Sequence, residues 1–114
     1  MAIYRLYTGS DGESHIDELS PGEGSDWASL TPAAGILFRA TPAGNFLDWH
    51  PAPRRQWVII LSGALEIGLG DGSLRRFGPG DARLVEDTTG RGHTTRVVGS
   101  QPCVMAFVPL EGPR

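Results

Sequence analysis

The stretch DWHPAPRRQWVIILSG, residues 48–63, joins a polar, proline-containing segment to a nearly continuous apolar run. The run at 56–61 (QWVIIL) has the length of a buried β-strand, and Gly63 supplies the turn that ends it. Pro51 and Pro53 predict an irregular path before this strand, because proline cannot donate a backbone hydrogen bond to a sheet. The stretch therefore predicts a core strand with polar side chains at its entrance.

Short strand patterns continue on both sides of this stretch, each closed by a turn with glycine, proline or serine. The 16 glycines and nine prolines favour frequent turns. No window carries the apolar stripe of an amphipathic helix. We expect an all-β fold, an antiparallel sandwich or barrel of about ten short strands. The predicted strands are 2–8, 14–19, 35–41, 45–50, 56–61, 64–69, 73–77, 82–86, 93–99 and 102–110.

The composition narrows the range of functions. A chain of 114 residues suits one domain with its own core. The net charge is −3 and the ten arginines are scattered, so we expect no nucleic-acid partner. No apolar run has the length of a membrane span and no signal peptide is visible, so we expect a cytoplasmic protein without membrane contact. Cys103 lies in an apolar run and is expected in the core.

Residues 20–34 are rich in glycine, proline and serine and predict a loop. Within it, Trp27 and Leu30 are the large apolar side chains. We expect these two residues to anchor the loop to the core.

Two segments together resemble the two-motif core of the cupin superfamily. They are HPAPRRQWVIILSG (50–63) and DGSLRRFGPGDARLVEDTTGRGH (71–93). The resemblance implies a jelly-roll β-barrel with a divalent metal inside it. We expect a single cupin domain over 1–114, with the barrel core at about 35–108 and the N-terminal strands at 2–19 packed on it.

The resemblance assigns the metal-site positions one by one. Gly63 matches the glycine that ends the first motif, which places Gln56 where the family has glutamate. His50 then matches the first histidine and His93 the third. Ala52 falls on the second histidine, so this ligand is absent.

What the resemblance implies is a site for Fe, Ni, Zn or Mn with a reduced ligand set, His50, Gln56 and His93. Neutral imidazoles are good ligands for such metals, whereas a glutamine carbonyl offsets none of the positive charge. Further ligands are expected from Glu86, which ends a strand before His93, or from His15.

The same pocket is expected to bind a small molecule. Side chains alternate along a strand, so an inward-facing Gln56 places every second residue after it inside as well. An arginine at the entrance suits a carboxylate. The expected ligand-binding residues are Arg54, Val58, Ile60 and Thr95.

A reading without any ligand remains open for each of these polar residues. His50 would bond backbone groups at the strand entrance, and Gln56 and His93 would bond each other across the barrel. Residues 87–89 (DTT) favour an Asx-type turn. Arg54 would form a salt bridge with Asp48 or Asp87.

The functional hypotheses follow from these alternatives. The first is a metal-dependent oxygenase, isomerase or lyase that acts on a small polar molecule. The second is a small-molecule-binding or sensor protein without metal and without catalysis. GESH (12–15), WHPAPRRQ (49–56) and DTTGRGH (87–93) also resemble a subset of small bacterial single-domain cupins, which implies a pocket but no particular reaction. A homodimer is expected through exposed apolar residues, namely Ile3, Tyr4, Trp57 and Ile59.

Overall fold

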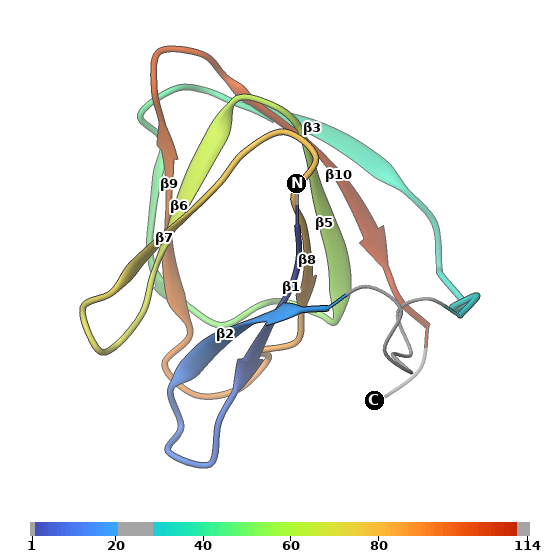
Figure 1. Ribbon diagram of the computed structural model, residues 1–114, viewed down its shortest axis with the longest axis vertical. Helices are drawn as coiled ribbons and strands as arrows, with labels where there is room; N and C mark the ends of the chain where they lie inside the picture. The colour runs from blue at the N-terminus through green and yellow to red at the C-terminus, as the bar shows by residue number, and fades with distance from the viewer. Residues whose placement is uncertain (1, 21–28, 112–114) are drawn as a thin grey trace.

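The computed structural model describes residues 2–20 and 29–111, and this part of the chain forms ten β-strands in two sheets (Figure 1). The described residues contain no helix, and the all-β prediction is confirmed. The strands are β1 (Ile3–Thr8), β2 (Ser14–Leu19), β3 (Leu37–Thr41), β4 (Phe46–His50), β5 (Gln56–Ser62), β6 (Ala64–Gly68), β7 (Leu74–Phe77), β8 (Ala82–Val85), β9 (His93–Val98) and β10 (Cys103–Pro109).

The two sheets lie as opposite walls around a common interior (Figure 1). One sheet has the strand order β2-β1-β8-β5-β10-β3 and the other β4-β9-β6-β7. Two details of the expected antiparallel barrel need correction. First, β1 pairs with β8 in parallel, because most of the chain separates these strands and no tight turn dictates an antiparallel approach. Second, within the described residues the two sheets remain separate hydrogen-bonded units, so the barrel is not closed.

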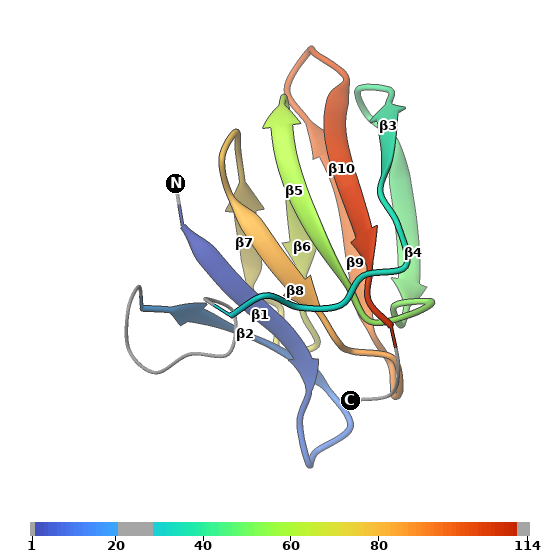
Figure 2. The same ribbon diagram turned by 90° about the vertical axis from the view of Figure 1, so that its right-hand side faces the viewer.

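The N-terminal strands extend one of these walls. β1 and β2 form an antiparallel hairpin, and β1 joins the six-stranded sheet along β8. Figure 2 shows this hairpin on one side of the sheet and β3 on the other. Residues 2–19 thus help to enclose the interior.

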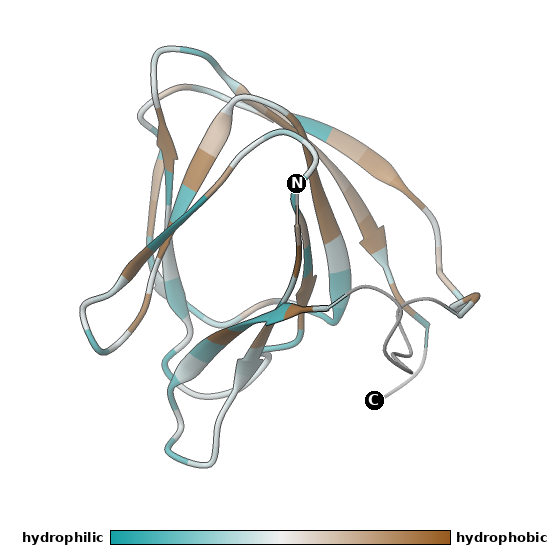
Figure 3. Ribbon diagram, in the orientation of Figure 1, coloured by the Kyte–Doolittle hydropathy of each residue, from teal (hydrophilic) through white to brown (hydrophobic). Residues whose placement is uncertain are grey.

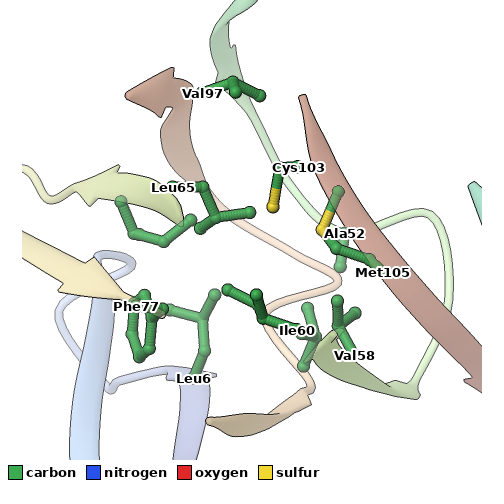
Figure 4. Packing of buried hydrophobic residues seen from close by; sticks show 11 residues of the cluster. Leu6, Ala52, Val58, Ile60, Leu65, Phe77, Val97, Cys103 and Met105 are labelled. Carbon is green, nitrogen blue, oxygen red and sulfur yellow. The ribbon is translucent and has the colours of Figure 1, made fainter. Parts of the chain in front are cut away.

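The core lies between the sheets and takes apolar side chains from both. On β5, Val58 and Ile60 are buried and face inward, whereas Trp57 and Ile59 alternate with them on the outer side. Figure 3 shows apolar positions spread over the strands of both sheets. Cys103 belongs to the buried cluster, as expected. Figure 4 shows this cluster, to which the four-stranded sheet contributes Leu65, Ile67, Phe77 and Val97.

The segment before β3 is held by its backbone and not by Leu30. Leu30 is fully exposed, so its expected role as an anchor is wrong. Trp27, the other expected anchor, lies outside the described residues. The backbone N–H of Ala34 donates to the carbonyl of Pro109, and Ala33 pairs with Leu110, which ties this segment to the end of β10.

A search of the described residues for membrane-spanning helices finds none of sufficient length and apolar character.

Candidate functional site

A cavity of about 550 Å³ opens between the two sheets. Both sheets and the 51–55 connection before β5 contribute to its wall. Apart from Gln56, its lining is apolar on the β5 and β10 side, and histidine and arginine side chains lie on the other parts of the wall. The lining includes His50, Ala52, Arg54, Gln56, Val58, Arg83, Val85, His93, Thr95, Met105 and Phe107, together with Arg39 at the β3 edge.

The pairing of β4 with β9 brings the two histidines together. His50 ends β4, His93 begins β9, and the two residues are register partners. A β-bulge between Leu47 and His50 inserts an extra residue into β4. Without it, residues three apart would face opposite sides of the strand, but here both Leu47 and His50 line the cavity.

A glycine makes this close approach possible. Gly92 has φ of +80°, and a Cβ atom at this position would collide with the carbonyl group of His50 and the nitrogen of Pro51. Only glycine combines this left-handed conformation with so short a distance between two backbone segments. Gly92 thus places the start of β9 directly against the end of β4.

His50 is oriented by its own strand. Its Nδ1 lies 2.6 Å from the carbonyl oxygen of Asp48. A carbonyl only accepts, so Nδ1 carries the hydrogen and Nε2 keeps its lone pair. The expected backbone bond at the strand entrance is therefore present, and it leaves the other ring nitrogen available as a ligand.

His93 is oriented by a buried carboxylate. Its Nδ1 lies 2.5 Å from Oδ2 of Asp87, which also accepts a hydrogen bond of 2.6 Å from the Ser14 hydroxyl. The Asp87 side chain is fully buried and that of His93 nearly so. The rings of His50 and His93 lie 4.7 Å apart between centroids. A carboxylate behind an imidazole is the usual arrangement for a metal-binding histidine, because it fixes the ring and raises its basicity.

This role of Asp87 corrects two sequence-based alternatives. An Asx-type turn was expected for residues 87–89. The Asp87 carboxylate instead bonds Ser14 of β2 and His93 of β9. The Asp87 carboxylate also contacts Nδ1 of His93 and not Arg54, so the alternative salt bridge of Arg54 with Asp87 is wrong. Ser14 belongs to the GESH motif, but its link to Asp87 spans 73 residues and could not be read from local spacing.

Several other predicted residues lie on the same cavity wall. Gln56 is buried and lies opposite Val85 on β8. Arg54, Val58 and Thr95 line the cavity as expected. Ile60 faces inward too, but it lies in the packed core and is not part of the cavity lining.

The structure does not bring Glu86 or His15 to the cavity. The Glu86 carboxylate accepts hydrogen bonds from Nε of Arg5 at 2.7 Å and Nε of Arg55 at 2.6 Å. It directly follows the inward-facing Val85 and so points to the other side of the sheet. His15 is half-exposed on β2, where Nε2 contacts the Asp11 carboxylate.

The donor set around the two histidines is small. Within residues 2–20 and 29–111, no group of three or more histidine, cysteine, aspartate and glutamate side chains is placed to hold a metal ion. The residues present offer two oriented imidazole nitrogens and the amide of Gln56. This set has fewer strong donors than the three protein ligands of typical catalytic metal sites, so a metal bound here would need water or a bound molecule to complete its coordination.

Like Arg39, Arg83 is a charged cavity residue that sequence reasoning missed. It lies on β8 in phase with Val85, and its side chain is buried against the Phe77 ring, with Cζ 5.1 Å from the ring centroid. Burial lowers the pKa of Arg83 to about 10, and nearby Cys103 and Asp87 act in the opposite direction. The sequence could have indicated this position, because side chains two residues apart on a strand face the same side. An inward-facing Val85 therefore places Arg83 inside as well.

Comparisons with known proteins agree with this architecture. No protein-family model matches the chain, and no curated protein matches it. Among solved structures, a Klebsiella pneumoniae protein with a double-stranded β-helix domain is 19% identical, with 82% of each chain covered and a TM-score of 0.53. A Streptococcus pyogenes protein of unknown function is also 19% identical, with 89% of this chain and 97% of that chain covered and a TM-score of 0.50.

A Bacillus halodurans protein is 17% identical, with a TM-score of 0.50 over 69% of this chain. The chain spans 64% of the length of that protein. At these identities the likeness concerns the fold. The chain is thus a small protein with the double-stranded β-helix, or cupin, fold, and the fold implied by the motif resemblance is confirmed.

Proposed function

We propose that this cupin-fold protein binds a divalent metal through Nε2 of His50 and Nε2 of His93, and a small polar molecule beside it. The single observation that supports this most is the orientation of the two rings. Each Nδ1 is already bonded to an oxygen, of Asp48 or of Asp87, so that Nε2 remains as a lone-pair donor on both rings.

The residues around the metal would have distinct tasks. Asp87 holds the His93 ring, and Gln56 offers an amide oxygen at the cavity wall. The apolar side chains of β5 and β10 exclude water from the bound molecule. When bound, Fe, Ni, Zn or Mn supplies Lewis-acid or oxygen-activating chemistry, and the catalytic form of this proposal is an oxygenase or isomerase.

A binding protein without metal and without catalysis is the second candidate. Two observations favour it. Position 56 carries a neutral amide where the cupin motif has glutamate. The cavity wall also carries Arg39, Arg54 and Arg83, whose positive charge disfavours a divalent cation.

The metal content of untagged protein tests the first proposal. After incubation with each of the four metals and dialysis, elemental analysis is expected to find about one ion per chain in the parent. His50→Ala and His93→Ala are each expected to weaken binding about tenfold or more. His15→Ala is the matched control and should bind like the parent, because His15 lies outside the cavity. Equal metal content in all four proteins would refute the site.

A thermal-shift experiment separates the two candidates. Stabilisation that appears with metal and disappears with chelator supports the metal-binding function, because a ligand of the folded state raises the melting temperature. Stabilisation by organic molecules alone, unchanged by chelator, supports the metal-free binding protein.

A further inference from the structure

Arg83 is the buried charge in the cavity that the proposed function leaves unused. The residue is 6% exposed and lines the cavity from the inner face of β8. Its Nε and Nη1 have no hydrogen-bond partner among the residues that the structure describes. With a pKa of about 10 the guanidinium stays charged near neutral pH. Arg83 is therefore a buried cation with unsatisfied donors.

Such a group calls for an anionic partner. Burying a charge without a hydrogen-bonded counter-charge is strongly unfavourable, and a guanidinium offers five N–H donors. The face of the Phe77 ring stabilises part of the positive charge through a cation–π contact. A ring supplies no negative charge, and the Asp87 and Asp81 carboxylates favour the charged guanidinium without a hydrogen bond to its Nε or Nη1. These two donors therefore remain available for an oxyanion.

The rest of the cavity wall has the same preference for an anion. Three arginines line the cavity, and its described lining contains neither aspartate nor glutamate. Asp87, the nearest acid to the histidines, is turned toward His93 Nδ1 and Ser14. A cleft lined by charges of one sign attracts small molecules of the opposite sign.

Strand register gives the spacing between Arg83 and Gln56 along the cavity wall. On β8, Val85 pairs with Gln56 and Arg83 with Val58. Two residues along a strand correspond to about 7 Å, which separates the level of Arg83 from that of Gln56. Val58, Met105 and Phe107 provide an apolar wall in the cavity. The matching ligand has a carboxylate at one end and a short apolar body.

We propose that the cavity binds a small organic carboxylate whose oxygens are held by the Arg83 guanidinium and whose apolar body packs on β5 and β10. The proposal rests on the proposed function in one respect, that the same cavity is the binding site for a small molecule. It requires no metal.

Titration of the metal-free protein with benzoate, benzamide and inorganic phosphate tests this proposal. Benzamide has the shape of benzoate without the charge, and phosphate has the charge without the apolar body. In calorimetry, benzoate is expected to bind about tenfold or more tightly than either of them, since charge-assisted bonds to arginine are about twice as strong as neutral ones. No binding of benzoate, or equal binding of benzoate and benzamide, would overturn it, as would preferential binding of phosphate.

Variants then assign the charge to one arginine. Arg83→Met is expected to weaken benzoate binding about tenfold or more, and by more than Arg54→Met at the exposed end of the cavity. Arg76→Met is the matched control and should bind like the parent, because Arg76 is exposed on β7 and lies outside the cavity lining. Circular dichroism reports whether each variant is folded. If Arg83→Met does not fold, Arg83→Lys takes its place, since lysine keeps the charge but loses the planar fork. Undiminished binding by the folded Arg83 variant, or a larger loss in Arg54→Met, would refute the assignment.

The test separates this inference from the metal proposal. His50→Ala should bind benzoate like the parent when both proteins are metal-free, while its metal binding is lost. Arg83→Met should show the reverse, with metal retained and benzoate lost. Failure of metal binding therefore leaves the carboxylate site standing, and failure of benzoate binding leaves the metal site standing.

Discussion

The imidazole of His93 is held by groups that lie far apart in the chain. Asp87 accepts from its Nδ1 and from the hydroxyl of Ser14 through the same carboxylate oxygen. His50 lies opposite, with its own Nδ1 bonded to a backbone carbonyl. Both rings thus have a defined orientation without a ligand, which would lower the entropic penalty of binding the proposed metal.

Asp87→Asn tests this orientation. Asparagine keeps the shape of the side chain but loses the negative charge that accepts from His93 Nδ1. We expect metal affinity, measured by competition with a coloured chelator, to fall about 10–100-fold. Ser14→Ala is the control, because it removes one hydrogen bond and leaves the carboxylate in place, so its effect should be smaller. Parent-like affinity in Asp87→Asn would contradict the role given to Asp87.

Arg83 illustrates a conflict between stability and binding at a single residue. Its pKa of about 10 lies below the ordinary value for arginine because burial penalises the charged form. A group whose pKa falls on folding opposes folding at every pH below its folded pKa. The opposition weakens only as the pH rises above about 10.

Arg83→Met is therefore expected to be more stable than the parent. Methionine has a similar length and needs no counter-charge, so the free energy of unfolding should rise by about 1–4 kcal/mol. Urea denaturation should give the same difference near pH 7 and near pH 9, because both values lie below the folded pKa of about 10. A variant less stable than the parent would show that Arg83 supports the fold itself.

The β4–β9 pair is the element that builds the site. Its bulge turns His50 inward, and Gly92 brings the two backbones together. The proline-containing segment at 51–55 follows at once and crosses to β5 without strand pairing. The positions of His50 and His93 thus depend on a local irregularity in each strand and not on regular alternation.

Gly92→Ala should disturb the site and the fold together. The added Cβ meets the backbone of His50 and Pro51, and alanine also resists a φ of +80°. Gly99→Ala is a matched control, since Gly99 has φ of +83° but an open surrounding. We expect Gly99→Ala to lose about 1–2 kcal/mol of stability in urea denaturation and Gly92→Ala clearly more, with weaker metal binding as well. Equal losses of stability in Gly92→Ala and Gly99→Ala would show that the short distance between Gly92 and the His50 backbone does not affect stability.

The alternation of inward-facing and outward-facing side chains predicted the strands better than the segments that connect them. The inward positions of β5 follow from the apolar run at 56–61, and the structure agrees. The same rule extended back to His50 fails in the segment 51–55, where Pro51, Ala52 and Pro53 all line the cavity. Prolines interrupt the sheet pattern there, so no period of two applies.

At the scale of the whole molecule, the outer face of the six-stranded sheet carries an apolar patch beside the Arg5–Glu86–Arg55 cluster. Ile3, Trp57 and Ile59 are half-buried on this side, and Leu61 and Phe38 are exposed at 48% and 66%. The expected contribution of Tyr4 needs correction, because Tyr4 packs edge-on against Phe77 in the interior, with ring centroids 4.9 Å apart. We propose that two copies pair through this outer face.

Leu61→Glu tests the dimer. We expect light scattering to give the mass of a dimer for the parent and of a monomer for Leu61→Glu, because a buried glutamate without a partner is unfavourable in an apolar interface. Leu74→Glu serves as the control. Leu74 is 64% exposed on β7 of the other sheet, and its substitution should leave the dimer intact. A monomeric parent at working concentration would rule out the proposal.

The sequence by itself determined the all-β class, the inward set of β5 and the resemblance that points to His50, Gln56 and His93. These features are local, because alternation, turns and motif spacing act over a few residues. Only the tertiary structure decided that Asp87 binds His93 and Ser14, that Glu86 faces away from the cavity and that Arg83 is enclosed in it. These partners depend on which distant strands pair and in what register, and a shift of one residue would reverse every side chain.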